Sequence, residues 1–149
     1  MIEFQLRTDP QIIRAVLPKM KQIYSAAAKH SWKSDFLCPV QGDEEFSESW
    51  INGLTQDSSE DRLTLAKVIM DPRLQHGYVE IDSEEAENLI RALSEMRLFI
   101  RQSFLSELSD DELETGDFDL EKQNGSNKIC YFSYLVLAEM QETLIDQLD

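Results

Sequence analysis

Residues 82–105 read DSEEAENLIRALSEMRLFIRQSFL, and this stretch decides the class of fold. Apolar residues recur there every three or four positions, which is the period of an α-helix. Because they spread around most of the helix, we expect a central, largely buried element. Asp82 followed by Glu85 resembles a capping box, which predicts that the helix begins at that point. The apolar positions are Ala86, Leu89, Ile90, Leu93, Met96, Leu98, Phe99, Ile100, Phe104 and Leu105.

The same helical period appears on both sides of this stretch, over residues 9–29, 43–54, 57–70 and 132–148. Asp9 and Pro10 indicate a helix start, with Asp9 as the N-cap. Pro18 lies inside the first helix and is expected to kink or divide it. The 149 residues include only 5 Gly and 4 Pro, a balance that favours helices. We therefore predict a mainly α fold, a compact bundle of about five helices.

Two short segments, residues 2–6 and 78–81, alternate apolar and polar residues as half-buried strands do. One strand cannot form a sheet alone. The two segments therefore either pair into a small two-stranded β ribbon at the edge of the bundle or stay unpaired.

Length and charge limit the classes of partner. The size is typical of a single domain, so we expect one helical domain over residues 1–149. The formal charge is 14 minus 29, or −15, and a field of that sign repels phosphate backbones and anionic lipid headgroups. We expect no nucleic-acid and no membrane partner. The N-terminus resembles no signal peptide, which predicts a cytoplasmic protein whose Cys38 and Cys130 are free thiols.

Residues 107–121 carry eight carboxylates and no Lys or Arg. Like charges at that density repel one another, so we expect an exposed acidic connector that reaches about residue 128, before the last helix. A calcium loop is the alternative, but neither register is complete. Counted from Asp110, Thr115 stands where the turn glycine is needed, and counted from Asp111, Lys122 stands where the last carboxylate is needed.

The residue patterns of common active sites are missing. His30 has no ligand at helical spacing, and His76 has Glu80 four residues away in a segment that is predicted to be extended. Ser25, Ser103 and Ser133 lack the glycines of a nucleophile elbow, and the chain has no glycine-rich phosphate loop. We predict no catalytic residue, no metal ligand set and no cofactor.

Arg97 and Arg101 interrupt the most apolar helix of an acidic protein. They are four residues apart and share a face, where they could bind Glu or Asp of a neighbouring helix or of a partner. Pairing inside the chain is the first alternative, and a contact with another protein is the second.

Several short motifs occur along the chain: Phe36-Leu37-Cys38-Pro39, Val79-Glu80-Ile81-Asp82, Glu95-Met96-Arg97-Leu98, Tyr134 and Met140-Gln141-Glu142-Thr143-Leu144. These stretches resemble those of an uncharacterised bacterial family, best represented in actinobacteria, that is known as a domain of unknown function. The resemblance implies no activity, but genes of the family often lie beside the adaptor of the Clp protease, which implies a role in regulated proteolysis. Val136, Glu139 and residues 99–103 depart from the family pattern, so the chain resembles a divergent member.

Two hypotheses about function follow. The first is a non-enzymatic protein-interaction module, with a protein partner that touches Arg97, Arg101, Gln141 or Glu142, and with homodimerisation left open. The second is a carboxylate-dependent enzyme with a bound divalent metal ion, which only the density of Asp and Glu supports.

Overall fold

The computed structural model of the chain describes residues 1–29, 60–105 and 125–148. In chain order, these ranges contain strand β1 (Ile2–Gln5), helix α1 (Pro10–Lys29), a helix over residues 60–69, a 3-10 helix (Pro72–His76), strand β2 (Tyr78–Ile81), a 3-10 turn (Ser83–Glu85), helix α3 (Ala86–Phe104) and helix α5 (Gly125–Leu148).

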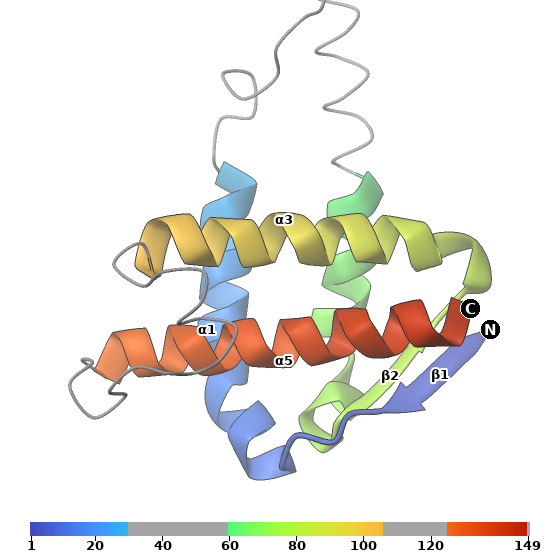
Figure 1. The fold of residues 1–149 in the computed structure, drawn as a ribbon, viewed down its shortest axis with the longest axis horizontal. Helices are drawn as coiled ribbons and strands as arrows, with labels where there is room; N and C mark the ends of the chain where they lie inside the picture. Colours follow the sequence, from blue (N-terminus) through green and yellow to red (C-terminus); the bar gives the residue numbers. More distant parts are fainter. Residues whose placement is uncertain (30–59, 106–124, 149) are drawn as a thin grey trace, which may run out of the picture.

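The helices form two layers that cross each other (Figure 1). The antiparallel helices α3 and α5 pack against each other, and α1 contacts both of them from the second layer. The helix over residues 60–69 runs beside α1 in that layer. It is tied to α1 by the Tyr24 hydroxyl, which donates a 3.0 Å hydrogen bond to the Arg62 carbonyl. The β ribbon closes one end of the assembly.

The prediction of a mainly α fold is confirmed, whereas the count of about five helices is high for the described part, which has four. Four of the five predicted helices have a counterpart here. The fifth, over residues 43–54, lies outside the described residues, as does the loop around Cys38. Helix α5 begins at Gly125, so the end of the expected connector is helical, and residues 107–124 lie outside the described part.

The two predicted strands do pair. β1 and β2 run antiparallel, with Ile2 opposite Ile81 and Phe4 opposite Val79. The chain enters β2 through Gly77, whose φ of +82° lies in the left-handed region that glycine adopts without strain. The Gly77 carbonyl accepts a 2.8 Å hydrogen bond from the Leu6 amide, which extends the contact between the two segments.

Helix α1 begins as predicted but continues through its proline. The Asp9 carboxylate accepts a 2.8 Å hydrogen bond from the Gln11 amide, which satisfies one of the amides left open at the helix start. Pro18 lies inside a helix of 20 unbroken residues, so of the two alternatives, a kink or a division, the division does not occur. Pro18 and Arg14 are both exposed, so water can satisfy the Arg14 carbonyl that the proline leaves without a donor.

The start of α3 differs from the capping-box prediction. A 3-10 turn stands between Asp82 and the helix, and the Asp82 side chain makes no capping hydrogen bond. The Glu85 carboxylate accepts a 2.9 Å hydrogen bond from Lys67 Nζ instead. The α3 helix is also less buried than expected, because it presents one exposed face on which Leu98 is 52% exposed.

One hydrophobic core lies between the two helical layers and under the ribbon. It draws on all four described helices and on both strands, so each layer buries its apolar side against the other. Its largest fully buried side chains are Ile13, Met20, Ile23, Leu65, Ile69, Leu74, Leu89, Leu93, Ile100, Leu137, Met140 and Leu144.

Candidate interaction surface on α3 and α5

Arg97 and Gln141 meet in the seam between α3 and α5. Arg97 Nη1 donates a 2.5 Å hydrogen bond to Gln141 Oε1. The Gln141 side-chain amide donates in turn to the Ile90 carbonyl at 3.0 Å and to Ser94 Oγ at 2.6 Å. Gln141 is only 5% exposed, so one buried amide ties together a charged side chain, a hydroxyl and a backbone carbonyl. The amide has both a donor and an acceptor, which this set of contacts needs.

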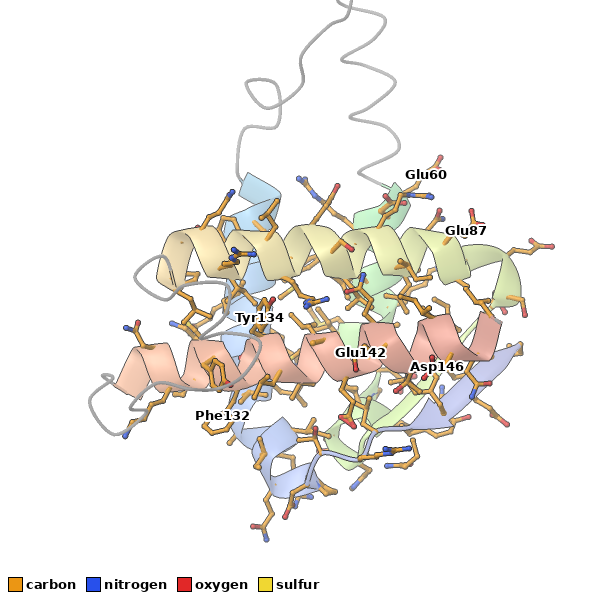
Figure 2. All side chains as sticks on the ribbon, viewed as in Figure 1. Glu60, Glu87, Phe132, Tyr134, Glu142 and Asp146 are labelled. Carbon is orange, nitrogen blue, oxygen red and sulfur yellow. The ribbon has the colours of Figure 1, made fainter. Side chains whose placement is uncertain are left out.

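Tyr134 holds the same guanidinium from a second direction. Arg97 Nη2 donates a 3.2 Å hydrogen bond to the Tyr134 hydroxyl, and the guanidinium carbon lies 4.9 Å from the centre of the tyrosine ring. Tyr134 projects from α5 toward α3 in Figure 2. Arg97 Nε is buried and has no hydrogen-bond partner among the described residues. The arginine is therefore held by neutral groups, and no carboxylate of the described residues pairs with it.

A shallow hollow opens beside this seam. It has a volume of about 190 Å³ and is lined by Ser94, Arg97, Leu98, Arg101 and Tyr134. Leu98 on α3 and Leu135 on α5 are 52% and 37% exposed. Arginine and tyrosine are residue types that protein-protein interfaces favour at their centres, and the exposed leucines add apolar area beside them.

The four predicted site residues therefore reach different places. Arg97 and Gln141 contact each other, Arg101 lines the same hollow, and Glu142 is exposed on α5 (Figure 2). Among the described residues, the hydrogen-bond partners of Arg97 are an amide and a phenol rather than the Glu or Asp that was considered. Sequence spacing could not show this, since the partners lie 37 and 44 positions away.

Sequence analysis did not identify a buried carboxylate that anchors α3 to the neighbouring helix. Asp61 is 3% exposed and accepts two hydrogen bonds from Arg91, at 3.0 Å from Nε and 3.1 Å from Nη2. This fork geometry is the strongest arrangement of an arginine and a carboxylate. In the sequence, Asp61 looks like one of several first-turn carboxylates, so its neighbours along the chain do not predict that it is buried.

Glu139 has a structural role that the sequence also concealed. Its carboxylate accepts hydrogen bonds from the Arg7 amide, from the Thr8 amide at 3.1 Å and from the Thr8 hydroxyl at 2.7 Å. These contacts fasten the chain between β1 and α1 to the middle of α5. The position noted as a departure from the family pattern thus has a defined contact.

A second arginine cluster lies on the ribbon and its approach. Arg73 donates to Glu80 at 2.7 Å and to Asp71 at 2.8 Å, and these hydrogen bonds lower the pKa of both carboxyl groups. The Tyr78 hydroxyl donates to Glu3 at 2.5 Å, and chiefly because of this bond the pKa of Tyr78 rises to about 12. Arg73 lies over the Tyr78 ring at 4.7 Å. The whole cluster joins β1, β2 and the preceding turn at the surface.

The described residues contain no candidate metal site and no site built on a histidine. No group of three His, Cys, Asp or Glu side chains there is arranged to hold a metal ion. His76 is exposed, and its backbone carbonyl accepts a hydrogen bond from Gln5 at 2.5 Å. Cys130 is buried and forms no disulfide. The acidic connector considered as a calcium loop lies outside the residues that the structure describes.

The fold and the seam define a class of protein: a mainly helical domain of two crossed layers, closed by a β ribbon, with an arginine-lined surface on α3 and α5. None of its described helices is long and apolar enough to cross a membrane. The chain belongs to the family described as "Domain of unknown function (DUF2017)", whose match covers residues 7–148. No curated protein and no solved structure matches it.

Proposed function

We propose that the chain is a non-enzymatic protein-interaction module and that it binds through the α3–α5 face. The observation that supports this proposal is the position of Arg97, which Gln141 and Tyr134 hold beside exposed leucines at a shallow hollow. An arginine held in one conformation loses less side-chain entropy when a partner docks, so it contributes more to affinity than a mobile one.

The size of the hollow favours a protein over a small molecule. Pockets that enclose small ligands are commonly about 300–1,000 Å³ and bury most of the ligand. The hollow at Arg97 has about 190 Å³ and is open to one side, which suits a side chain of a docking protein. A hollow of about 490 Å³ beside Leu63 is larger, but it borders Glu60, where the described range begins.

Site-specific photocrosslinking tests the proposal. A photoreactive amino acid replaces Leu98 or Leu135 on the proposed surface, or Ile12 on α1 as a control of similar exposure to Leu135. We expect crosslinks to a protein, identified by mass spectrometry, from positions 98 and 135 in living cells, and several-fold fewer from position 12. Equal crosslinking from all three positions, or none from position 98 or 135, would contradict a binding surface on α3 and α5.

A narrower form of the proposal concerns regulated proteolysis in the cytoplasm, and it rests on the family resemblance alone. If the partner is the adaptor of the Clp protease, the purified adaptor should bind the full chain and protect the α3–α5 surface. The measurement is hydrogen exchange of α3 and α5 with and without adaptor. Unchanged exchange at saturating adaptor would remove this version and leave the general proposal in place.

A further inference from the structure

The α3–α5 face carries opposite charges at its two ends. At one end lie Arg97 and Arg101 of α3 and Lys128 of α5, all partly exposed; we call this the basic end. At the other lie Glu87 of α3 and Glu142 and Asp146 of α5, all exposed; we call this the acidic end. Figure 2 shows Glu142 and Asp146 toward the end of α5 that lies beside the start of α3, and Tyr134 toward the opposite end.

This division follows from the antiparallel packing of two helices with opposite charge gradients. Helix α3 has Glu87 in its first turn and Arg97 and Arg101 in its second half, while Arg91 between them is bound by Asp61. Helix α5 has Lys128 near its start and Glu142 and Asp146 near its end. Because the helices run in opposite directions, their acidic parts coincide and their basic parts coincide. Among the described residues, Lys128, Glu142 and Asp146 form no ion pair inside the chain.

Exposed apolar side chains accompany both ends. Leu98 and Leu135 lie in the basic half, and Ile145, which is 42% exposed, lies in the acidic half. A partner that matches this face needs an acidic region opposite the arginines, a basic region opposite Glu142 and Asp146, and apolar groups in both halves. A second copy of the same face has this pattern when it is turned end for end.

We infer that this face binds a second copy of the chain in a two-fold symmetric dimer, an inference that rests on the proposed function and names its partner. The symmetry axis lies in the plane of the face and runs across the helices near Ser94. A half turn about it places the basic end of each copy on the acidic end of the other, and α3 packs antiparallel on α3. Such an interface is self-complementary, as two-fold contacts between identical chains must be. Turning the copy about an axis along the helices would instead place like charges together.

The dimensions set the expected strength. The 19 residues of α3 span about 28 Å, and two adjacent helices present a face roughly 20 Å wide, so each copy contributes about 600 Å². This area is at the lower end for specific complexes, where weak and transient contacts are found, and we expect a dissociation constant in the micromolar range. The charge of −15 per chain opposes association at long range, but screening at about 0.15 M salt confines that repulsion to about 8 Å.

Charge reversal followed by mixing tests the dimer. One variant carries Arg101→Glu and Lys128→Glu, and the other carries Glu142→Arg and Asp146→Arg. Arg14→Glu with Lys21→Glu is the matched control, since it changes the charge of exposed α1 residues by the same amount as the first variant. Sedimentation equilibrium gives the mass of each full-length protein across a concentration series, and circular dichroism checks that each is folded.

We expect the wild type and the control to move from 17.2 kDa toward twice that mass with similar dissociation constants. Each reversed variant should dissociate at least about tenfold more readily, because like charges then face each other. An equimolar mixture of the two reversed variants should regain dimers near wild-type affinity, since their charges are again complementary. That recovery also excludes misfolding as the cause of the single-variant losses.

A wild type that stays at 17.2 kDa up to about 100 µM, well above the expected dissociation constant, would overturn the dimer. So would a mixture that remains monomeric, or a dimer that the reversals leave unchanged. If crosslinking at Leu98 still captures a different protein in these cases, the proposed function stands and only the identity of its partner is wrong.

Discussion

Two arginines of this chain are each held by several groups, in opposite ways. Arg97 lies partly buried between helices and is bound by an amide and a phenol. Arg73 is on the surface, is 53% exposed, and is bound by two carboxylates. The hydrogen bonds of the surface cluster lower the pKa of Asp71 and Glu80 and raise that of Tyr78, yet water competes with all of these bonds. The seam has few charged groups, but it is buried, so its polar atoms cannot replace a lost partner with water.

The difference teaches that the number of charged groups in a cluster is a poor guide to how much the cluster stabilises the fold. An exposed ion pair gains little because both partners are well solvated without it. A buried polar group that loses its partner keeps the full cost of desolvation. Stability should therefore depend more on Gln141 than on any carboxylate of the Arg73 cluster.

The largest effect should come from Gln141→Leu. The change leaves the Ile90 carbonyl, Ser94 Oγ and Arg97 Nη1 without their common partner, and we expect a loss of about 3 kcal/mol in the free energy of unfolding. Urea denaturation followed by circular dichroism measures it. The control is Glu142→Gln on the exposed side of the same turn, where about 0.5 kcal/mol or less is expected. Equal losses for the two variants would refute the contrast between seam and surface.

Arg91→Met tests an intermediate case, in which one partner is buried and the other is exposed. Asp61 would keep its buried position without the two hydrogen bonds from Arg91. We expect a loss of about 2 kcal/mol, below the range for fully buried pairs because Arg91 is 53% exposed. The double variant Asp61→Asn with Arg91→Met should lose less than Arg91→Met alone, since no buried charge then remains. A greater loss in the double variant would contradict this account.

Gly77→Ala tests whether the stability of the ribbon depends more on its backbone conformation or on its charged side chains. The φ of +82° disfavours any side chain, and an added Cβ would meet Gln5 Nε2 at 2.7 Å. We expect a loss of about 1 to 2 kcal/mol in thermal or urea unfolding, as for alanine at other left-handed positions. Arg73→Gln in the same assay should change stability less. If the order is reversed, the Arg73 cluster matters more than its exposure implies.

The smallest effect concerns the ionisation of Tyr78. Its pKa is raised to about 12 by the hydrogen bond to Glu3, whereas an unfolded tyrosine ionises near pH 10. The folded pKa is the higher of the two, so the stabilisation is fully present below about pH 10 and is lost as pH rises through about 12. Ultraviolet difference titration against Tyr78→Phe isolates this group. Glu3→Gln should lower the pKa of Tyr78, and an unchanged titration would show that the bond does not control it.

Local patterns were enough to predict most of the framework. The apolar period predicted the four described helices, Asp9 was correctly placed as the cap of α1, and the alternation in residues 2–6 and 78–81 predicted the strands that pair. The errors came where a local pattern had two outcomes. Pro18 is accommodated because its helix turn is exposed, and Glu85 contacts Lys67 rather than capping α3.

The candidate site was only partly predictable. Arg97 and Arg101 were predicted to make specific contacts because charged residues are unusual in an apolar helix. Gln141 was selected because it belongs to the family motif. Their arrangement depends on the position of α5 along α3 when the two helices pack. The sequence of neither helix determines that position by itself. The roles of Asp61 and Glu139 escaped prediction for the same reason, because an ordinary helix carboxylate differs from a buried one only in its neighbours.

The sequence by itself determined the secondary structure, the division into apolar and polar faces and the excess of negative charge, because these follow from the order of residues along the chain. Only the tertiary structure decided that Arg97 meets Gln141 and Tyr134, that Asp61 is buried against Arg91, and that the charges of α3 and α5 gather at opposite ends of one face. Those contacts join residues 30 to 44 positions apart, and their geometry is set when the two helical layers bury their common core.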